Sequence, residues 1–95
     1  MYTLFPTKAF LRKAKKLIDS AQKRQNLEES LIKLETNPFY STLKTHKVQS
    51  GKYGLMYSSR VTGDLRIIWN FDQDDKLILL LLDLGGHEGG NKVYK

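Results

Sequence analysis

Basic, imidazole and phenol side chains that could act on a phosphodiester are spread between residues 46 and 94. They are His46, Lys47, Lys52, Arg60, Arg66, His87 and Tyr94. Cleaving RNA without a metal needs a base for the 2′-hydroxyl proton, cations around the phosphate and an acid for the departing 5′ oxygen. Arginine and lysine can stabilise the phosphate charge, histidine exchanges protons near neutral pH, and tyrosine can stack on a base. These residue types therefore favour metal-free cleavage of RNA.

Other common chemistries lack their residues. The chain has no cysteine, which excludes disulfides, thiolate metal sites and a cysteine nucleophile. It has no Gly-Lys-Ser/Thr phosphate loop, no pair of carboxylates placed for acid and base work, and only two isolated histidines. We therefore expect neither a metal nor a cofactor.

The charge of the chain indicates a polyanionic partner. The formal net charge is +6, which fits nucleic acid, an anionic membrane surface or an acidic protein. Residues 1–26 alone hold seven Lys/Arg against one acid, Asp19. The first predicted helix carries five of these cations, and we expect them to help dock RNA by a sequence-independent attraction. They are Lys8, Arg12, Lys13, Lys15 and Lys16.

Hydrophobic periodicity predicts the elements that must position these side chains. Apolar residues recur at helical spacing from Lys8 to about Ser20, after Thr7 as a cap, and again after Asn26 up to Asn37-Pro38. Alternating or continuous apolar runs predict strands. The predicted strands cover residues 2–5, 55–61, 65–71 and 77–84.

This order predicts one α+β domain over residues 1–95. A helical hairpin should pack on one face of a mainly antiparallel sheet of three or four strands, which leaves the other face for function. The turn Thr62 to Asp64 also makes a test of register possible. If it spans three residues, Arg60 lies opposite Arg66 on one face, and a two-residue turn would separate them. Two cations held side by side would indicate a phosphate site.

The whole chain, including the two predicted N-terminal helices, also resembles a known family, and the specific signal lies in residues 43–94. The segment LKTHKVQSGKYGLMYSSRVTGDLRIIW, the strand LILLLLDLGGHEGG and the ending VY resemble RelE/ParE superfamily toxins, particularly the mRNA interferase branch. The resemblance implies the toxin of a type II toxin-antitoxin system that cuts mRNA in the ribosomal A site. It also implies a cognate antitoxin that lies over the basic face.

The resemblance assigns roles to single residues. Arg60 matches the arginine used against the scissile phosphate, and Arg66 matches the basic residue that opens the next strand. His87 falls where members place a catalytic histidine or arginine, which would act as the acid. Tyr94 matches the C-terminal aromatic residue that stacks on or helps activate the nucleotide, and His46 matches a histidine that some members carry before the hairpin.

The general base stays open. Lys47 and Lys52 match the twin basic residues of the type member only loosely. The base is therefore one of His46, Lys52 and Tyr94.

Two other functions compete with this interpretation. A ParE-like inhibitor would bind DNA gyrase without nuclease activity, and such relatives typically lack the terminal His and Tyr. A basic RNA-binding or membrane-surface module would bind without cutting. The longest apolar run, Leu77 to Leu82, is too short to span a bilayer, so we expect a cytoplasmic protein that does not enter the membrane.

Overall fold

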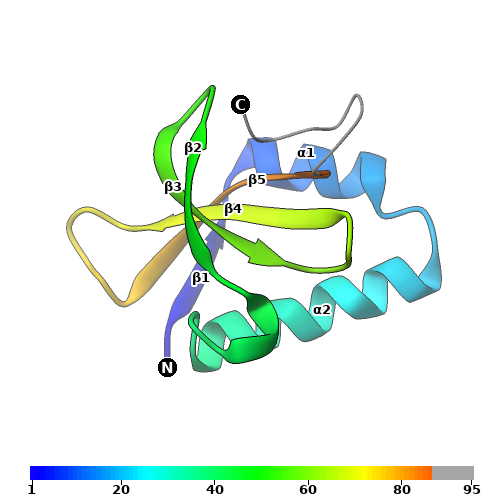
Figure 1. Ribbon diagram of the computed structural model, residues 1–95, viewed down its shortest axis with the longest axis horizontal. Helices are drawn as coiled ribbons and strands as arrows, with labels where there is room; N and C mark the ends of the chain where they lie inside the picture. The colour runs from blue at the N-terminus through cyan, green and yellow to red at the C-terminus, as the bar shows by residue number, and fades with distance from the viewer. Residues whose placement is uncertain (87–95) are drawn as a thin grey trace.

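The computed structural model describes residues 1–86. Two helices pack on a sheet of five strands (Figure 1). In chain order the elements are β1 (Thr3–Pro6), α1 (Lys8–Leu17), α2 (Ala21–Thr36), a short 3-10 helix (Ser41–Leu43), β2 (His46–Ser50), β3 (Gly54–Arg60), β4 (Leu65–Phe71) and β5 (Ile78–Gly86). The predicted α+β class is therefore confirmed.

Hydroxyl caps start both helices. Thr7 Oγ1 accepts from the Phe10 amide at 3.3 Å and donates to the Leu81 carbonyl at 2.8 Å, which ties the start of α1 to β5. Ser20 Oγ accepts from the Lys23 amide at 3.2 Å. The second helix thus begins at Ala21, earlier than the predicted cap at Asn26. The prediction missed this start because the first turns of the helix are polar and exposed and show no apolar period.

The strand order in the sheet is β1-β5-β4-β3-β2. β1 pairs with β5 in parallel, and the other neighbours are antiparallel. β2 was not predicted, because His46–Ser50 contains a single large apolar residue, Val48. It forms as an edge strand whose backbone pairs with β3, so it needs little burial of its own.

The hydrophobic core lies between the helices and one face of the sheet. Phe10 of α1, Leu27 and Leu34 of α2 and Ile67 and Trp69 of β4 belong to one buried cluster. Figure 1 shows α2 on one side of the sheet, where it contacts β1 and the 3-10 helix, and α1 beside β5. We call the face with Ile67 and Trp69 the helix-side face.

The second face carries the alternate residues of the same strands. By register, His46 lies opposite Ser58, Ser58 opposite Ile68, and Arg60 opposite Arg66. The centre of this face is buried, since Ser58 and Ile68 are 0% exposed. The β2–β3 hairpin bends over the second face, and the Tyr53 hydroxyl at its turn donates a hydrogen bond to the Leu82 carbonyl of β5 at 3.1 Å. The accessible part of the second face is therefore its rim.

Candidate active site

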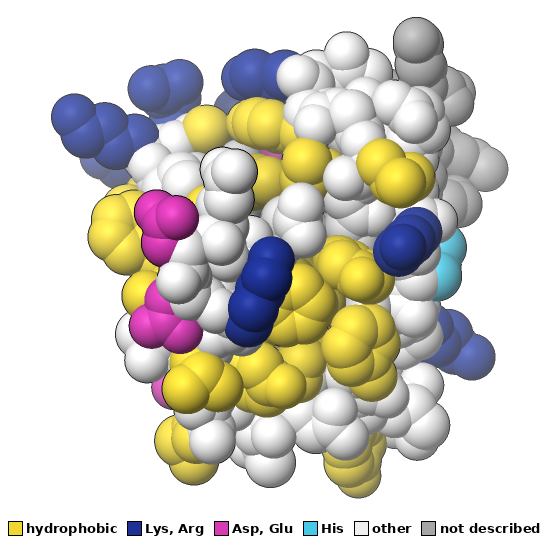
Figure 2. Space-filling view, turned by 90° about the vertical axis from the view of Figure 1, so that its left-hand side faces the viewer, with side chains coloured by type: hydrophobic (Ala, Val, Ile, Leu, Met, Phe, Trp, Pro, Cys, Tyr) yellow, Lys and Arg dark blue, Asp and Glu magenta, His cyan; other side chains and the backbone are white. Residues whose placement is uncertain are grey.

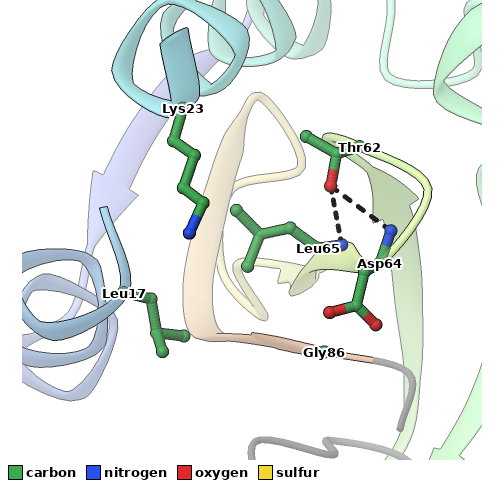
Figure 3. A pocket seen from close by; sticks show the side chains of 6 residues that line it. All are labelled: Leu17, Lys23, Thr62, Asp64, Leu65 and Gly86. Carbon is green, nitrogen blue, oxygen red and sulfur yellow. Dashed lines mark hydrogen bonds between the residues drawn. The ribbon is translucent and has the colours of Figure 1, made fainter. Parts of the chain in front are cut away.

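The β3–β4 turn holds two arginines side by side at one end of the sheet. Arg60 and Arg66 are directly opposite each other, as predicted for a three-residue turn from Thr62 to Asp64. The Val61 amide donates to the Leu65 carbonyl at 2.9 Å, which closes the turn. Thr62 Oγ1 accepts from the amides of Asp64 at 3.3 Å and Leu65 at 3.0 Å (Figure 3). A hydrogen-bonded turn therefore fixes the backbone between the two cations.

Both guanidinium groups lie close to this turn. Arg66 Nη1 donates to the Thr62 carbonyl. Arg60 Nη2 lies 3.8 Å from the position that a Cβ on Gly63 would take. Within residues 1–86 the ion pairs are Lys13–Asp83 and Lys23–Asp19, so neither arginine has a carboxylate partner there. Two like charges opposite each other are unfavourable without an anion, so this end of the sheet suits a phosphate.

A hollow of about 160 Å³ opens next to the turn. Figure 3 shows its lining residues, which come from the ends of α1 and β5, the start of α2 and the β3–β4 turn. They are Leu17, Lys23, Thr62, Asp64, Leu65 and Gly86. Gly86 lies opposite Leu65 and immediately precedes His87 in the sequence. The hollow therefore adjoins the position where the chain continues to the predicted acid.

Lys23, Thr62 and Asp64 line this hollow and were not predicted as functional residues, and Arg60 and Arg66 are not among its lining residues. Lys23 Nζ lies 2.9 Å from Asp19 Oδ1, and this hydrogen bond and charge lower the pKa of Asp19. Thr62 and Asp64 had been read only as turn residues. Lys23 carries no local signal, because the fold alone brings the start of α2 to the β3–β4 turn.

His46 shares the second face with the arginines. It lies opposite Ser58, two residues along β3 from Arg60, and such diagonal neighbours are about 7–8 Å apart. Its Nδ1 lies 2.8 Å from the Lys44 carbonyl, and the side chain is exposed. The ring is therefore oriented by the backbone and accessible to a ligand held by Arg60.

The two lysines do not join this group. Lys47 pairs with Tyr57, and its Nζ lies 5.9 Å from the centre of that ring, on the helix-side face. Lys52 lies in the turn before β3, with its Nζ 5.4 Å from the Tyr53 ring. That turn and Arg60 lie at opposite ends of β3.

Four of the five predicted docking cations of α1 are exposed, and Lys13 is partly covered. Lys13 Nζ lies 3.2 Å from Asp83 Oδ1 of β5. The remaining four present their charge to solvent. They are Lys8, Arg12, Lys15 and Lys16.

Two predicted site residues, His87 and Tyr94, lie outside the described residues. Within residues 1–86 no group of three or more His, Asp or Glu side chains is arranged to hold a metal ion. In the same part of the chain no helix is both long and apolar enough to cross a membrane.

Comparisons with known proteins rest on structure alone. No family model and no curated protein matches the sequence. A metal-bound toxin from Helicobacter pylori superposes with a TM-score of 0.71 at 23% identity, over 92% of this chain and 96% of that chain. A YoeB/ParE toxin from Agrobacterium tumefaciens gives a TM-score of 0.68 at 15% identity, over 90% and 99%. Escherichia coli YafQ in its complex with DinJ gives a TM-score of 0.59 at 24% identity, over 92% and 94%.

These similarities confirm the predicted RelE/ParE-like fold. The chain has the α+β fold of these toxins over nine tenths of its length.

Proposed function

We propose that this chain is the toxin of a type II toxin-antitoxin system and cleaves mRNA on the ribosome without a metal ion. The observation that carries the proposal is the Arg60–Arg66 pair, fixed opposite each other by register and without a carboxylate partner within residues 1–86. The toxin fold supports the same class of function, since its solved relatives include toxins at TM-scores of 0.71 and 0.68.

In the proposed reaction the 2′ oxygen attacks the adjacent phosphorus and the bond to the 5′ oxygen breaks. The products are a 2′,3′-cyclic phosphate and a 5′-hydroxyl. Arg60 and Arg66 stabilise the charge on the phosphate. His87 gives its proton to the departing 5′ oxygen, and Tyr94 stacks on or orients the nucleotide.

The base that takes the 2′ proton is His46, Lys52 or Tyr94. Position favours His46 over Lys52, because His46 shares a face with Arg60 and Lys52 lies at the opposite end of β3. Lys47 and the exposed cations of α1 then serve to attract ribosomal RNA.

Mapping the 5′ ends of transcripts tests the proposal. In a translating extract the wild-type chain should produce new 5′-hydroxyl ends within open reading frames. Arg60→Ala and His87→Ala should each lower the cleavage rate at least about 100-fold, the usual loss on removing one such catalytic group. Arg24→Ala is the matched control, because Arg24 is an exposed arginine on α2.

Two substrate changes test the chemistry separately. A 2′-deoxy nucleotide at the cleaved position should abolish cleavage, because it removes the attacking hydroxyl. If sulfur replaces a non-bridging oxygen of the cleaved phosphate, a thiophilic metal ion should not restore the lost cleavage rate. Rescue by that ion would contradict the metal-free mechanism while leaving the nuclease assignment intact.

The ParE-like alternative predicts a different result. Trapped gyrase–DNA complexes together with intact mRNA would replace the nuclease proposal with gyrase inhibition. Equal cleavage by wild type, Arg60→Ala and His87→Ala would remove the site assignment.

A cognate antitoxin is the proposed protein partner. The relative YafQ is found in a complex with a second protein, DinJ. An antitoxin encoded beside this chain should abolish cleavage in the same extract at an equimolar amount. Failure of every neighbouring gene product to do so would contradict this part of the proposal.

A further inference from the structure

A cluster of aromatic side chains remains exposed beyond the end of α2, and the proposed cleavage site does not use it. Phe39 is 51% exposed and Tyr40 is 47% exposed. Figure 2 shows the side of the molecule that lies on the left in Figure 1, which carries a broad hydrophobic patch with basic side chains upon it and acidic ones gathered to one side. The aromatic cluster lies on the helix-side face, because Phe39 packs edge-on against Tyr57 and Trp69.

The loop that carries these rings is held firmly. The Thr45 hydroxyl donates to the Pro38 carbonyl at 2.6 Å, and Asn37 Oδ1 accepts from the Phe39 amide at 3.0 Å. Pro38 and Leu43 of the same loop are buried, at under 2% and 1% exposure. The two aromatic rings are thus presented to solvent by a loop whose other apolar residues reach the core.

Cations lie over the rings of this cluster. Lys33 Nζ is 5.6 Å from the centre of the Tyr40 ring, and Lys47 Nζ is 5.9 Å from the centre of the Tyr57 ring. Tyr57 in turn stacks on Trp69 with ring centres 4.8 Å apart and planes 19° apart. Rings beside ammonium groups offer a flat apolar surface and a positive charge together, which suits an anionic ligand with flat apolar parts.

We propose that Phe39 and Tyr40, with Lys33 and Lys47, form an aromatic platform that binds single-stranded RNA by stacking on its bases. Bases stack on aromatic rings whatever their identity, while lysines contact the phosphates between them. Lys47 and Tyr57 alternate along their strands with His46 and Arg60, so the aromatic platform faces away from the proposed cleavage site. The platform is therefore a second RNA contact, separate from the one that positions the scissile phosphate.

Binding of a short, fluorescently labelled 2′-O-methyl RNA, followed by anisotropy, tests this proposal. This RNA has no free 2′-hydroxyl and so cannot be cleaved by 2′ attack. The experiment uses the full chain with Arg60→Ala, so the result does not depend on the proposed cleavage.

Tyr40→Ala should weaken binding roughly 5- to 150-fold, the range seen when one stacking ring is removed. Lys47→Gln should weaken binding and reduce the salt slope by about 0.7, as expected for one lost phosphate contact. The ring of Tyr40 contacts only Lys33 among the described aromatic and cation contacts, so its removal leaves the core in place. Tyr40→Phe should retain most of the affinity, because it keeps the ring.

The matched controls are Phe5→Ala and Lys15→Gln. Phe5 is 58% exposed on β1, and Lys15 is exposed on α1, away from the aromatic platform. Phe5→Ala should leave the affinity within about twofold of the parent, and Lys15→Gln should weaken it less than Lys47→Gln does.

Three results would overturn the proposal. The first is equal RNA affinity in Tyr40→Ala and the parent. The second is a dimer, seen by sedimentation, that Tyr40→Ala dissociates. The third is an acidic peptide that binds the platform and is not displaced by excess RNA. The last two would assign the surface to a protein instead.

Discussion

The two faces of strands β3 and β4 use alternate residues of the same segments in opposite ways. On the helix-side face, Ser59 and Trp69 are 0% exposed and joined by a hydrogen bond from Trp69 Nε1 to Ser59 Oγ at 2.8 Å. At the rim of the second face, Arg60 and Arg66 lie opposite each other without a carboxylate partner in the described part of the chain. The polar groups of the helix-side pair have hydrogen-bond partners, whereas the two arginine charges have no carboxylate to offset them within residues 1–86.

This difference separates stability from function along two short strands. Removing a satisfied, buried group leaves a cavity or an unpaired atom and lowers the free energy of unfolding. Removing one of two repelling surface cations should cost little stability and should remove anion binding instead. The predictions below test this division, from the largest expected effect to the smallest.

Trp69→Ala should lower the free energy of unfolding by about 3–5 kcal/mol, because it empties the largest fully buried site. Urea unfolding followed by circular dichroism measures the change. Since a typical domain has only about 5–15 kcal/mol to lose, Trp69→Phe is measured alongside and should cost less. Leu55→Ala is the control, because Leu55 on β3 is 59% exposed, and a cost as large as that of Trp69→Ala would break the comparison.

Ser59→Ala should lower the free energy of unfolding by about 1–3 kcal/mol, the cost of a buried donor without its acceptor. Ser59 Oγ accepts from Trp69 Nε1 and lies 2.6 Å from Thr45 Oγ1. The chain has one tryptophan, so its fluorescence reports the change directly. An exposed serine, Ser41, gives the control variant Ser41→Ala, and equal effects at both serines would contradict the prediction.

The sequence predicted the helix-side face better than the rim. Leu65, Ile67, Trp69 and Phe71 alternate with less apolar residues, and that period is set by the pleat of a strand with one buried face. Arg60 and Arg66 could be placed opposite each other because only the length of one turn was unknown. Local pattern was therefore sufficient for the helix-side face, whereas the arginine pair also required the length of the turn.

What the sequence could not predict depends on contacts between distant segments. β2 has little hydrophobic pattern, because its stability comes from backbone pairing with β3. Lys23 reaches the hollow beside the β3–β4 turn only because the start of α2 packs next to that turn. Phe39 and Tyr40 are of residue types that usually lie in the core, yet both are exposed. The hydrogen-bonded loop around Pro38 holds them at the surface, and this depends on a contact with Thr45 that local sequence does not predict.

Arg60→Gln should change the free energy of unfolding by less than about 1 kcal/mol, since it relieves a like-charge pair at the surface. It should instead remove stabilisation by phosphate. At a phosphate concentration of about ten times the dissociation constant, the wild-type chain should gain roughly 1.4 kcal/mol. Thermal melts with and without phosphate measure this gain at constant ionic strength. Arg24→Gln should keep the full stabilisation by phosphate. If Arg24→Gln loses this stabilisation as Arg60→Gln does, phosphate stabilises the chain through its overall positive charge and not through a site at Arg60.

The ion pair between Lys13 and Asp83 should contribute the smallest effect. Asp83 lies opposite Ile68 on β5, and its side chain is 15% exposed while that of Lys13 is 35% exposed. A partly exposed pair of this kind contributes at most about 1 kcal/mol. A double-mutant cycle of Lys13→Met and Asp83→Asn, followed by urea unfolding, measures the coupling.

Lys13 also neutralises the charge of the Asp83 carboxylate. By register, Asp83 is two residues from Gly85, which lies opposite Arg66. Lys13→Met should therefore lower the gain in stability from phosphate slightly, because the freed carboxylate adds negative charge near the anion site. Adding Asp83→Asn to Lys13→Met should restore that gain. If the gain in stability from phosphate is unchanged in Lys13→Met, Asp83 is too far from the arginines to affect the anion. The Lys13–Asp83 ion pair then has no influence on anion binding at the second face.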